Sequence, residues 1–225
     1  MNGFLDFMTD SEALLFGFFL LKSGRKSPYF INAGEYYKTG GQLNKLGKFY
    51  AELIRQSGRS DFNVLFGPAY KGIPLAVLTA AALAESDGFD LKVTFNRKEA
   101  KDHGEGGSLI GYIPRDGDRI AIIEDVTSAG TSVRETTALL KELGIDAKIV
   151  ALYISVDRLE RGTGELSAIE QLKEDFGISV YSIANAEDII GYLENPACKV
   201  PDAAKHAEKM REYLAQYGVK QQINY

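Results

Sequence analysis

Short apolar runs alternate with segments of helical period along most of the sequence, and this alternation constrains the fold more than any other feature. Strands are expected where apolar residues are continuous, and helices where they recur every three or four positions. Alternating strands and helices favour an α/β fold with a central, mostly parallel sheet flanked by helices, and binding sites at the carboxyl ends of the strands. The pattern predicts strands at residues 64–66, 91–95, 119–123 and 147–154, and helices at 42–57, 73–85 and 132–143.

Both ends of the sequence carry further elements. Residues 10–16 are expected to form a helix, with Thr9 or Asp10 as its N-cap. The stretch FFLLKSGRKSPYFIN, residues 18–32, predicts a hairpin of two short strands around a turn at Ser23 and Gly24. Toward the C-terminus the pattern predicts helices at 167–176, 185–193 and 202–217 and a strand at 178–182, and His206 on the polar last helix is expected to be solvated.

Composition bounds the class of protein. No repeat or Ser- or Pro-rich linker divides the 225 residues, so a single domain over residues 1–225 is expected. The net charge of −5 argues against a nucleic-acid partner. Cys198 is the only cysteine, which excludes an internal disulfide and a zinc site built on several thiolates. The apolar run at residues 13–21 is too short to span a bilayer, which takes about 20 residues, and acidic residues rather than a basic leader precede it. We therefore expect a cytoplasmic protein with no membrane partner.

The sequence IAIIEDVTSAGTS, residues 120–132, places two carboxylates after a predicted strand and small residues before a predicted helix. Residues 127–131 leave backbone N–H groups exposed at a helix N-terminus, where an anion such as a phosphate is well placed. The nucleotide loop G-x-x-x-x-G-K-[ST] is not present. Glu124 and Asp125 would repel phosphate unless they face hydroxyl groups or a divalent cation. A ribose 5-phosphate unit meets both requirements.

Residues 120–132 resemble the phosphoribosyl diphosphate signature of type I phosphoribosyltransferases, and further stretches resemble orotate phosphoribosyltransferases in particular. The resemblance extends over about residues 13–195. It implies the type I fold, with a small N-terminal hood of about residues 1–36 over the active site. The further stretches are LKSGRKSPYFINAG (21–34), FGPAYKGIPLA (66–76), FNRKEAKDHGEGG (95–107) and SVDRLERG (155–162).

Members of this family transfer the 5-phosphoribosyl group of phosphoribosyl diphosphate to orotate, giving orotidine 5-phosphate and diphosphate, a step of pyrimidine (UMP) synthesis that uses Mg²⁺. The resemblance implies the same substrates and cofactor here. Because a ring nitrogen of orotate attacks the anomeric carbon as diphosphate leaves, the protein mainly has to place two reactants and neutralise the leaving group. Mg²⁺ is expected to be held by diphosphate, ribose and water, with no direct protein ligand.

The resemblance also assigns site residues by position. Lys101, His103 and Asp125 correspond to catalytic positions, and His103 either protonates the departing diphosphate or, as we prefer, donates a hydrogen bond as a cation. Three glycines within residues 104–107 favour a mobile loop there. The positions expected to bind phosphoribosyl diphosphate are Lys22, Tyr70, Lys71, Arg97, Lys98, Lys101, His103, Glu124, Asp125, Val126, Thr127, Ser128, Ala129, Gly130, Thr131 and Ser132.

Orotate is expected to contact Phe30, Ile31, Ser128 and Arg158. A guanidinium can bond a carboxylate through two nitrogens, which suits Arg158 to the carboxylate of orotate. The alternative for Arg158 is a structural ion pair with Asp157 or Glu160. Ile31 stands where relatives often carry a second phenylalanine, and Ser128 where they often carry threonine. Neither change removes a charge or a hydrogen-bond donor.

The family further implies a homodimer in which Lys98, Lys101 and His103 reach the neighbouring subunit's site. Two other functions fit parts of the sequence. A purine or uracil phosphoribosyltransferase would keep the acid pair but has little use for Arg158 facing a carboxylate. A regulator that binds phosphoribosyl diphosphate without turnover would call for a basic nucleic-acid surface, against which the net charge of −5 argues.

Overall fold

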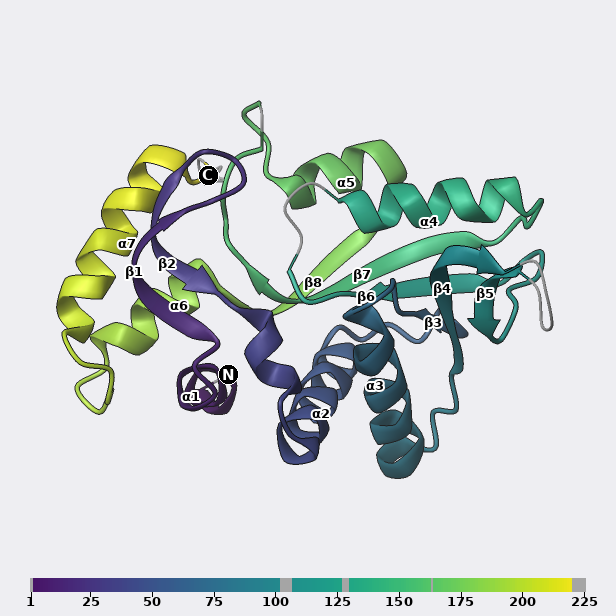
Figure 1. The fold of residues 1–225 in the computed structure, drawn as a ribbon, viewed down its shortest axis with the longest axis horizontal. Helices are drawn as coiled ribbons and strands as arrows, with labels where there is room; N and C mark the ends of the chain where they lie inside the picture. Colours follow the sequence, from purple (N-terminus) through teal and green to yellow (C-terminus); the bar gives the residue numbers. More distant parts are fainter. Residues whose placement is uncertain (1, 102–106, 127–129, 163, 220–225) are drawn as a thin grey trace.

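A six-stranded sheet forms the centre of the protein in the computed structural model, which describes residues 2–101, 107–126, 130–162 and 164–219 (Figure 1). The strand order is β5-β4-β3-β6-β7-β8, and only the β4–β5 pair is antiparallel. The predicted α/β fold with a mostly parallel sheet is confirmed. The strands are β3 (Val64–Phe66), β4 (Lys92–Lys101), β5 (Gly107–Gly111), β6 (Arg119–Ile123), β7 (Lys148–Asp157) and β8 (Ser179–Asn185).

Helices cover both faces of this sheet. On one face lie α2 (Gly40–Gln56) and α3 (Gly72–Asp87), and on the other α4 (Thr131–Glu142) and α5 (Ala168–Phe176) (Figure 1). Successive residues of a strand point to opposite faces. In β6, accordingly, Ala121 and Ile123 belong to the core on the α2–α3 side, whereas Ile120 and Ile122 belong to the core on the α4–α5 side. Burial on both faces explains why the central strands read as continuous apolar runs.

A second layer is built from both ends of the chain. It contains α1 (Asn2–Asp10), the antiparallel hairpin β1 (Leu14–Leu20) and β2 (Lys26–Ile31), α6 (Ala186–Glu194) and α7 (Ala203–Tyr217). Helix α7 packs against the hairpin, with the Tyr29 and Tyr213 rings edge to face at 6.3 Å between centroids. The hairpin expected at residues 18–32 is confirmed, and its packing against α7 ties it to the C-terminal part of the chain.

The prediction for residues 10–16 was wrong. The helix lies at Asn2–Asp10, because Phe4, Leu5, Phe7 and Met8 form its buried face. The chain then turns at Glu12, which has a positive φ of 59°, and continues as β1. The aromatic and β-prone character of residues 14–20 and the pairing of Leu14 with Ile31 outweigh any helical tendency there.

Three smaller features also differ from expectation. Strand β5 and the short 3-10 helix η1 (Ala33–Tyr37) were not predicted. His206 is only partly exposed to solvent: its ring stacks on Phe16 with 4.6 Å between centroids, and partial burial lowers its pKa. Most of the glycine-rich stretch at 104–107 lies outside the described residues. None of the helices in the described part of the chain has the length and apolar content needed to cross a membrane.

Candidate functional site

The acid pair lies where β6 ends and the chain leaves the sheet. Backbone hydrogen bonds to β7 continue through it, since the Glu124 N–H donates to Tyr153 O at 2.9 Å and the Ser155 N–H donates to Asp125 O at 2.8 Å. Two side chains reinforce these carbonyls. The Tyr50 hydroxyl, from α2, donates to Glu124 O at 2.7 Å, and the Ser155 hydroxyl donates to Asp125 O at 2.5 Å. The backbone of the pair is therefore fixed from two sides.

Glu124 is a half-buried carboxyl held by the helix that follows it. The Ser132 hydroxyl, in the first turn of α4, donates to Glu124 Oε2 at 2.5 Å. Burial raises the pKa of Glu124 to about 7, the Ser132 hydrogen bond opposes the rise, and the negative charge of Asp125 adds to it. Because Ser132 is itself buried, its hydroxyl supports Glu124 in this structure. A direct contact of Ser132 with phosphoribosyl diphosphate stays a prediction.

Asp125 is paired with the lysine at the start of α3. Lys71 Nζ lies 2.8 Å from Asp125 Oδ2, and the Val126 N–H donates to Asp125 Oδ1 at 2.8 Å. The loop before α3 is tightly packed, because a Cβ on Gly72 would lie 2.7 Å from Pro68 Cδ and 2.8 Å from the carbonyl carbon of Gly67. Only glycine fits there. The sequence-predicted Lys71 and Asp125 are thus brought together.

The predicted phosphate-binding stretch, residues 127–131, ends at the start of α4. Gly130 adopts the left-handed conformation with φ of 65°, and a Cβ there would also collide with the side chain of Leu172. Thr131 begins the helix, next to the acid pair through the Ser132–Glu124 bond. Thr127, Ser128 and Ala129 lie outside the described residues, so their predicted contacts stay predictions.

Three of the predicted basic residues lie on β4. Lys98 Nζ lies over the Tyr70 ring, 5.0 Å from its centroid, so two residues expected to bind phosphoribosyl diphosphate are in contact. Arg97 has a buried Nε with no hydrogen-bond partner among the described residues. Lys101 ends the strand. His103 lies outside the described residues. On the same strand, Asn96 Oδ1 accepts a hydrogen bond of 2.8 Å from the Ala69 N–H, and the Ala69–Tyr70 peptide bond is cis.

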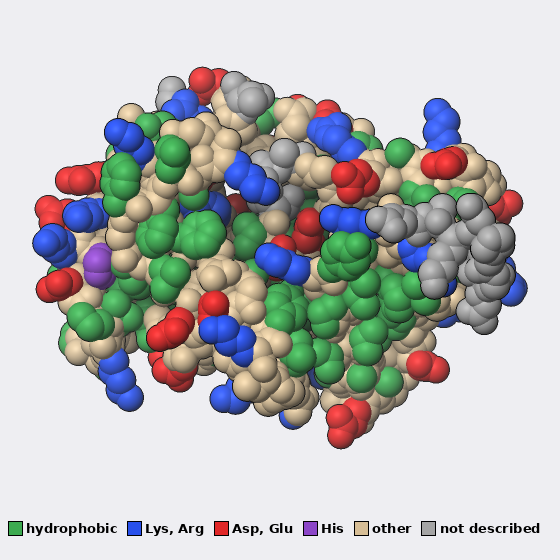
Figure 2. All heavy atoms as spheres, in the orientation of Figure 1, with side chains coloured by type: hydrophobic (Ala, Val, Ile, Leu, Met, Phe, Trp, Pro, Cys, Tyr) green, Lys and Arg blue, Asp and Glu red, His purple; other side chains and the backbone are tan. Residues whose placement is uncertain are grey.

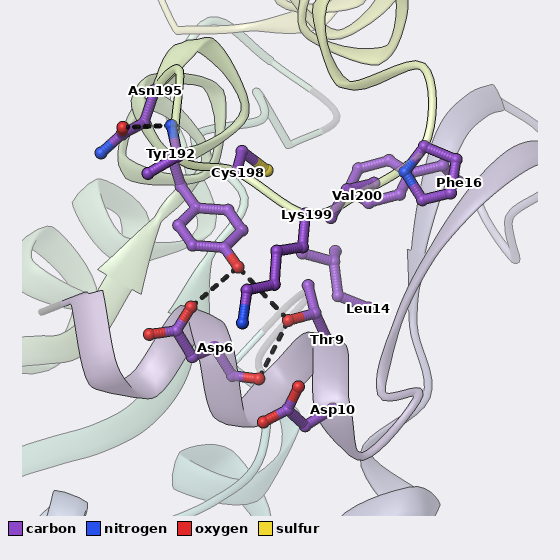
Figure 3. Close-up of a pocket in the computed structure, with 12 residues that line it drawn as sticks. Asp6, Thr9, Asp10, Leu14, Phe16, Tyr192, Asn195, Cys198, Lys199 and Val200 are labelled. Carbon is purple, nitrogen blue, oxygen red and sulfur yellow. Dashed lines mark hydrogen bonds between the residues drawn. The ribbon is translucent and has the colours of Figure 1, made fainter.

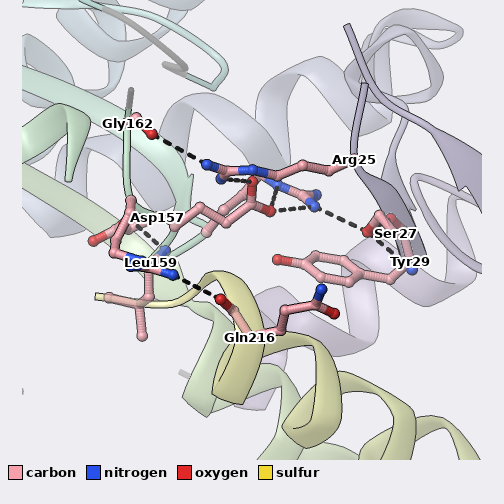
Figure 4. A network of polar contacts seen from close by, with 10 residues as sticks. Arg25, Ser27, Tyr29, Asp157, Leu159, Gly162 and Gln216 are labelled. Atoms are coloured by element: carbon pink, nitrogen blue, oxygen red, sulfur yellow. Dashed lines mark hydrogen bonds and ion pairs between the residues drawn. The ribbon is translucent and has the colours of Figure 1, made fainter. Parts of the chain in front are cut away.

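Arg158 follows β7 and is already engaged by protein groups. Its Nε and Nη2 lie 2.7 and 2.6 Å from Glu160 Oε1, and its Nη2 also donates to Ser27 Oγ at 3.0 Å. The guanidinium carbon stands 4.1 Å from the centroid of the Tyr29 ring. The ion pair with Glu160 that the sequence left open is present. Asp157 does not share it, and accepts instead from the Leu159 N–H at 2.9 Å (Figure 4).

The hairpin supplies the remaining predicted residues. Phe30 is 38% exposed and stacks on Phe19 at 5.4 Å between centroids, so part of its ring is free to contact a ligand. Ile31 is buried and pairs with Leu14 in the hairpin, as a core residue does. Lys22 is exposed in the turn between the strands. The roles of these three side chains in binding stay predictions.

A separate cavity of about 710 Å³ lies between α1, β1 and the segment after α6 (Figure 3). None of the residues that line it is a predicted site residue. Three of its polar side chains contact one another, since the Tyr192 hydroxyl donates to Asp6 Oδ1 at 2.9 Å and lies 3.4 Å from the Thr9 hydroxyl. The acid pair, Lys71 and the start of α4 lie elsewhere, at the carboxyl end of the sheet.

Sequence reasoning missed the groups that hold the site together. The sequence predicted Tyr50 only as a core position of a periodic helix, and the strand predicted at 147–154 ended one residue before Ser155. The pairing of Arg25 with Glu160 joins residues 135 positions apart. No local pattern signals such pairings, although a serine inside a strand of otherwise apolar residues was a hint that its hydroxyl has a partner.

An acid pair at a strand end, a following helix N-terminus and a lysine beside the acids form the arrangement expected of a phosphoribosyltransferase. The phosphoribosyl transferase domain model matches residues 32–174, so the chain belongs to this family. Within it, the relatives are orotate phosphoribosyltransferases. That of Clostridium acetobutylicum is 50% identical over 96% of this chain and 97% of the relative, and that of Salmonella newport is 49% identical with the same coverage.

Solved structures agree. The orotate phosphoribosyltransferase of Francisella tularensis superimposes with a TM-score of 0.82 at 37% identity, covering 96% of this chain and 99% of that one. The UMP synthase of Leishmania donovani has a TM-score of 0.72 at 21% identity, covering 96% of this chain and 42% of that chain, and supports the fold alone.

Proposed function

We infer that this chain transfers the 5-phosphoribosyl group of phosphoribosyl diphosphate to orotate, giving orotidine 5-phosphate and diphosphate. The observation that carries the inference is the placement of Glu124 and Asp125 between Lys71 and the start of α4. Relatives at about 50% identity over nearly the whole chain bear the name of this activity. The reaction would supply one step of pyrimidine synthesis, and we expect it in the cytoplasm.

We propose that the sugar, its 5-phosphate and its diphosphate bind around the acid pair. The 5-phosphate would accept N–H donors at residues 127–131, and the 2- and 3-hydroxyls would donate to Glu124 and Asp125. The Lys71 side chain is 55% exposed, so it can turn from Asp125 to the diphosphate. Arg97, Lys98, Lys101 and His103 would complete the cation cluster that neutralises the leaving group.

We propose that Mg²⁺ accompanies the diphosphate. Both oxygens of Asp125 already accept a partner, Lys71 Nζ and the Val126 N–H. This occupancy fits an ion held mainly by the diphosphate, the ribose hydroxyls and water, with the acids beside it. When bound, the ion would neutralise charge on the departing diphosphate. The protein side of the reaction is placement: Phe30, Ile31, Ser128 and Arg158 would hold the orotate ring against the anomeric carbon.

The test is to follow the loss of orotate absorbance with phosphoribosyl diphosphate, with and without Mg²⁺. Rapid loss that needs both Mg²⁺ and phosphoribosyl diphosphate is expected. Uracil, hypoxanthine and adenine serve as matched alternative bases. Turnover of one of these in preference to orotate would assign the chain to salvage, and binding of phosphoribosyl diphosphate without turnover of any base would make it a regulator.

We further propose a homodimer formed through α3. This helix is apolar on all sides, and hydrophobic side chains gather over it on the surface (Figure 2). Val77 is 45% exposed, and Ala81 and Ala84 continue the same exposed stripe, since residues three and four apart lie on one helix face. Tyr70, 67% exposed, lies just before the N-terminus of α3. An apolar exposed face of this kind is typical of an association surface.

Two experiments test the dimer. Val77→Glu should convert a dimer to a monomer in sedimentation, whereas Leu143→Glu, at an exposed apolar residue after α4, should not. A wild-type monomer would refute the proposal. To test whether Lys101 acts in the neighbouring subunit's site, chains carrying Lys101→Ala and chains carrying Asp125→Asn are mixed, and partial recovery of activity is expected. No recovery would place Lys101 in its own subunit's site.

A further inference from the structure

Glu160 joins two arginines from distant parts of the chain. Its Oε1 takes Nε and Nη2 of Arg158, and its Oε2 lies 3.3 Å from Arg25 Nη1 (Figure 4). The side chains of Glu160 and Arg158 are each only 14% exposed. Breaking a partly buried ion pair leaves a charge without a partner, which is costly. Glu160 therefore cannot turn away without leaving two cations unpaired.

This arrangement uses up most of the donors of Arg158. Its Nε and Nη2 face Glu160, Nη2 also donates to Ser27, and the guanidinium plane lies over the Tyr29 ring. Among the described residues, the hydrogen bonds and the ion pair of Arg158 use Nε and Nη2 and none uses Nη1, while the Tyr213 hydroxyl lies near both Arg158 and Glu160. The edge of the Arg158 guanidinium formed by Nε and Nη2 is thus occupied, and a ligand can reach the guanidinium only at Nη1.

The second contact of Glu160 reaches the hairpin. Arg25 also donates from Nη2 to Gly162 O at 3.1 Å, and its guanidinium lies 5.1 Å from the centroid of the Tyr217 ring. Arg25 directly precedes β2, the strand that carries Phe30. A single carboxylate therefore ties the loop after β7 to the hairpin that forms the other side of the expected orotate site.

We propose that Glu160 is a positioning residue for orotate. It fixes the Arg158 guanidinium so that Nη1 faces the base, and through Arg25 it holds the hairpin that carries Phe30 in a fixed position relative to Arg158. This rests on the proposed transfer to orotate. The alternative hypothesis is that Glu160 occupies the position of the orotate carboxylate and moves away from Arg158 when orotate binds. The Arg25 contact opposes that hypothesis, because departure of Glu160 would break both arginine contacts together.

The test compares Glu160→Gln with Glu165→Gln, a matched control whose side chain is 76% exposed. Glu160→Gln keeps the shape and removes the charge, and the KM for orotate should rise about tenfold, the scale of one lost hydrogen bond to a charged group. The KM for phosphoribosyl diphosphate should stay within about twofold, and the control should leave both constants unchanged.

An unchanged or lower KM for orotate, or an equal rise in both constants, would overturn the proposal. If Glu160→Gln does not fold, Arg25→Gln tests the hairpin contact, and again a selective rise in the KM for orotate is required. A wild-type protein that does not consume orotate would refute the proposed function itself. An active wild type with an indifferent Glu160→Gln variant would refute only the positioning role.

Discussion

Replacing Glu124 with glutamine should stabilise the ligand-free protein at neutral and alkaline pH. Burial raises the pKa of this carboxyl from its ordinary value of 4.5 to about 7. Below pH 4.5 the group is protonated in both the folded and the unfolded chain, so it contributes no difference. As the pH rises from 4.5 to 7, the unfolded chain ionises first, and the wild type loses stability. Glutamine has no proton to lose and avoids this loss.

The size of the effect follows from that pKa. Each tenfold change in an ionisation constant is worth about 1.4 kcal/mol, so the free energy of unfolding should be higher in Glu124→Gln by about 3 kcal/mol above pH 7. For a chain of this length such a difference corresponds to roughly 6–12 °C in Tm. Glutamine can also keep the hydrogen bond from Ser132, because its amide oxygen accepts as the carboxylate does.

The assay is denaturant unfolding of wild type and variant between pH 4.5 and 9. The gap between them should be near zero at pH 4.5, widen through pH 6 and level off above pH 7. Glu142→Gln, at an exposed residue at the end of α4, is the control and should show no such pH-dependent gap. A stability difference that does not change with pH would refute the reasoning, because the effect of glutamine would then not come from the ionisation of Glu124.

Three further predictions concern the same site. Asp125→Asn should lower turnover about a hundredfold or more while Tm hardly moves, since its partner Lys71 is exposed; initial rates and thermal melts check this, and early melting with full specific activity would contradict it. Tyr50→Phe should lower kcat/KM for phosphoribosyl diphosphate about tenfold. The control Tyr153→Phe, which removes a hydroxyl 3.0 Å from that of Ser57, should cost about 1 kcal/mol of stability and leave kcat/KM unchanged; the same kcat/KM in both variants would exclude a special role for Tyr50. In urea unfolding, Gly72→Ala should lower the free energy of unfolding by about 1–3 kcal/mol, because the added Cβ collides with Pro68. Gly191→Ala, in a helix with open space around it, should raise the free energy of unfolding by about 0.5–1 kcal/mol; an unchanged stability of Gly72→Ala would show that the loop shifts to accept the Cβ.

The sheet was predictable because its strands are buried on both faces. Residues 64–66 and 119–123 are continuous apolar runs between helices, and the structure has strands at these same positions. The N-terminal segment was not predictable in the same way. Residues 2–10 and 14–20 are both rich in aromatic residues, and only their partners decide between helix and strand: α1 buries Phe4 and Met8, and Leu14 pairs with Ile31. Tertiary contacts override local preference in such segments.

The site was predictable where chemistry sits in consecutive residues. Glu124, Asp125 and the start of α4 form one motif, and the structure keeps them together. The supporting groups come from elsewhere in the sequence: Tyr50 lies 74 positions from Glu124, and Ser27 lies 131 positions from Arg158. Arg158 shows the limit most clearly. The sequence supplied its charge, but only the fold shows that Glu160 occupies one edge of its guanidinium.

A crystal structure of the protein with ribose 5-phosphate tests the central claim most directly. Both sugar hydroxyls should lie about 2.5–3.0 Å from carboxylate oxygens of Glu124 and Asp125, with the phosphate at the first N–H groups of α4. Sugar density at any other place, or the two carboxylates turned outward into water with the ligand bound, would contradict the account.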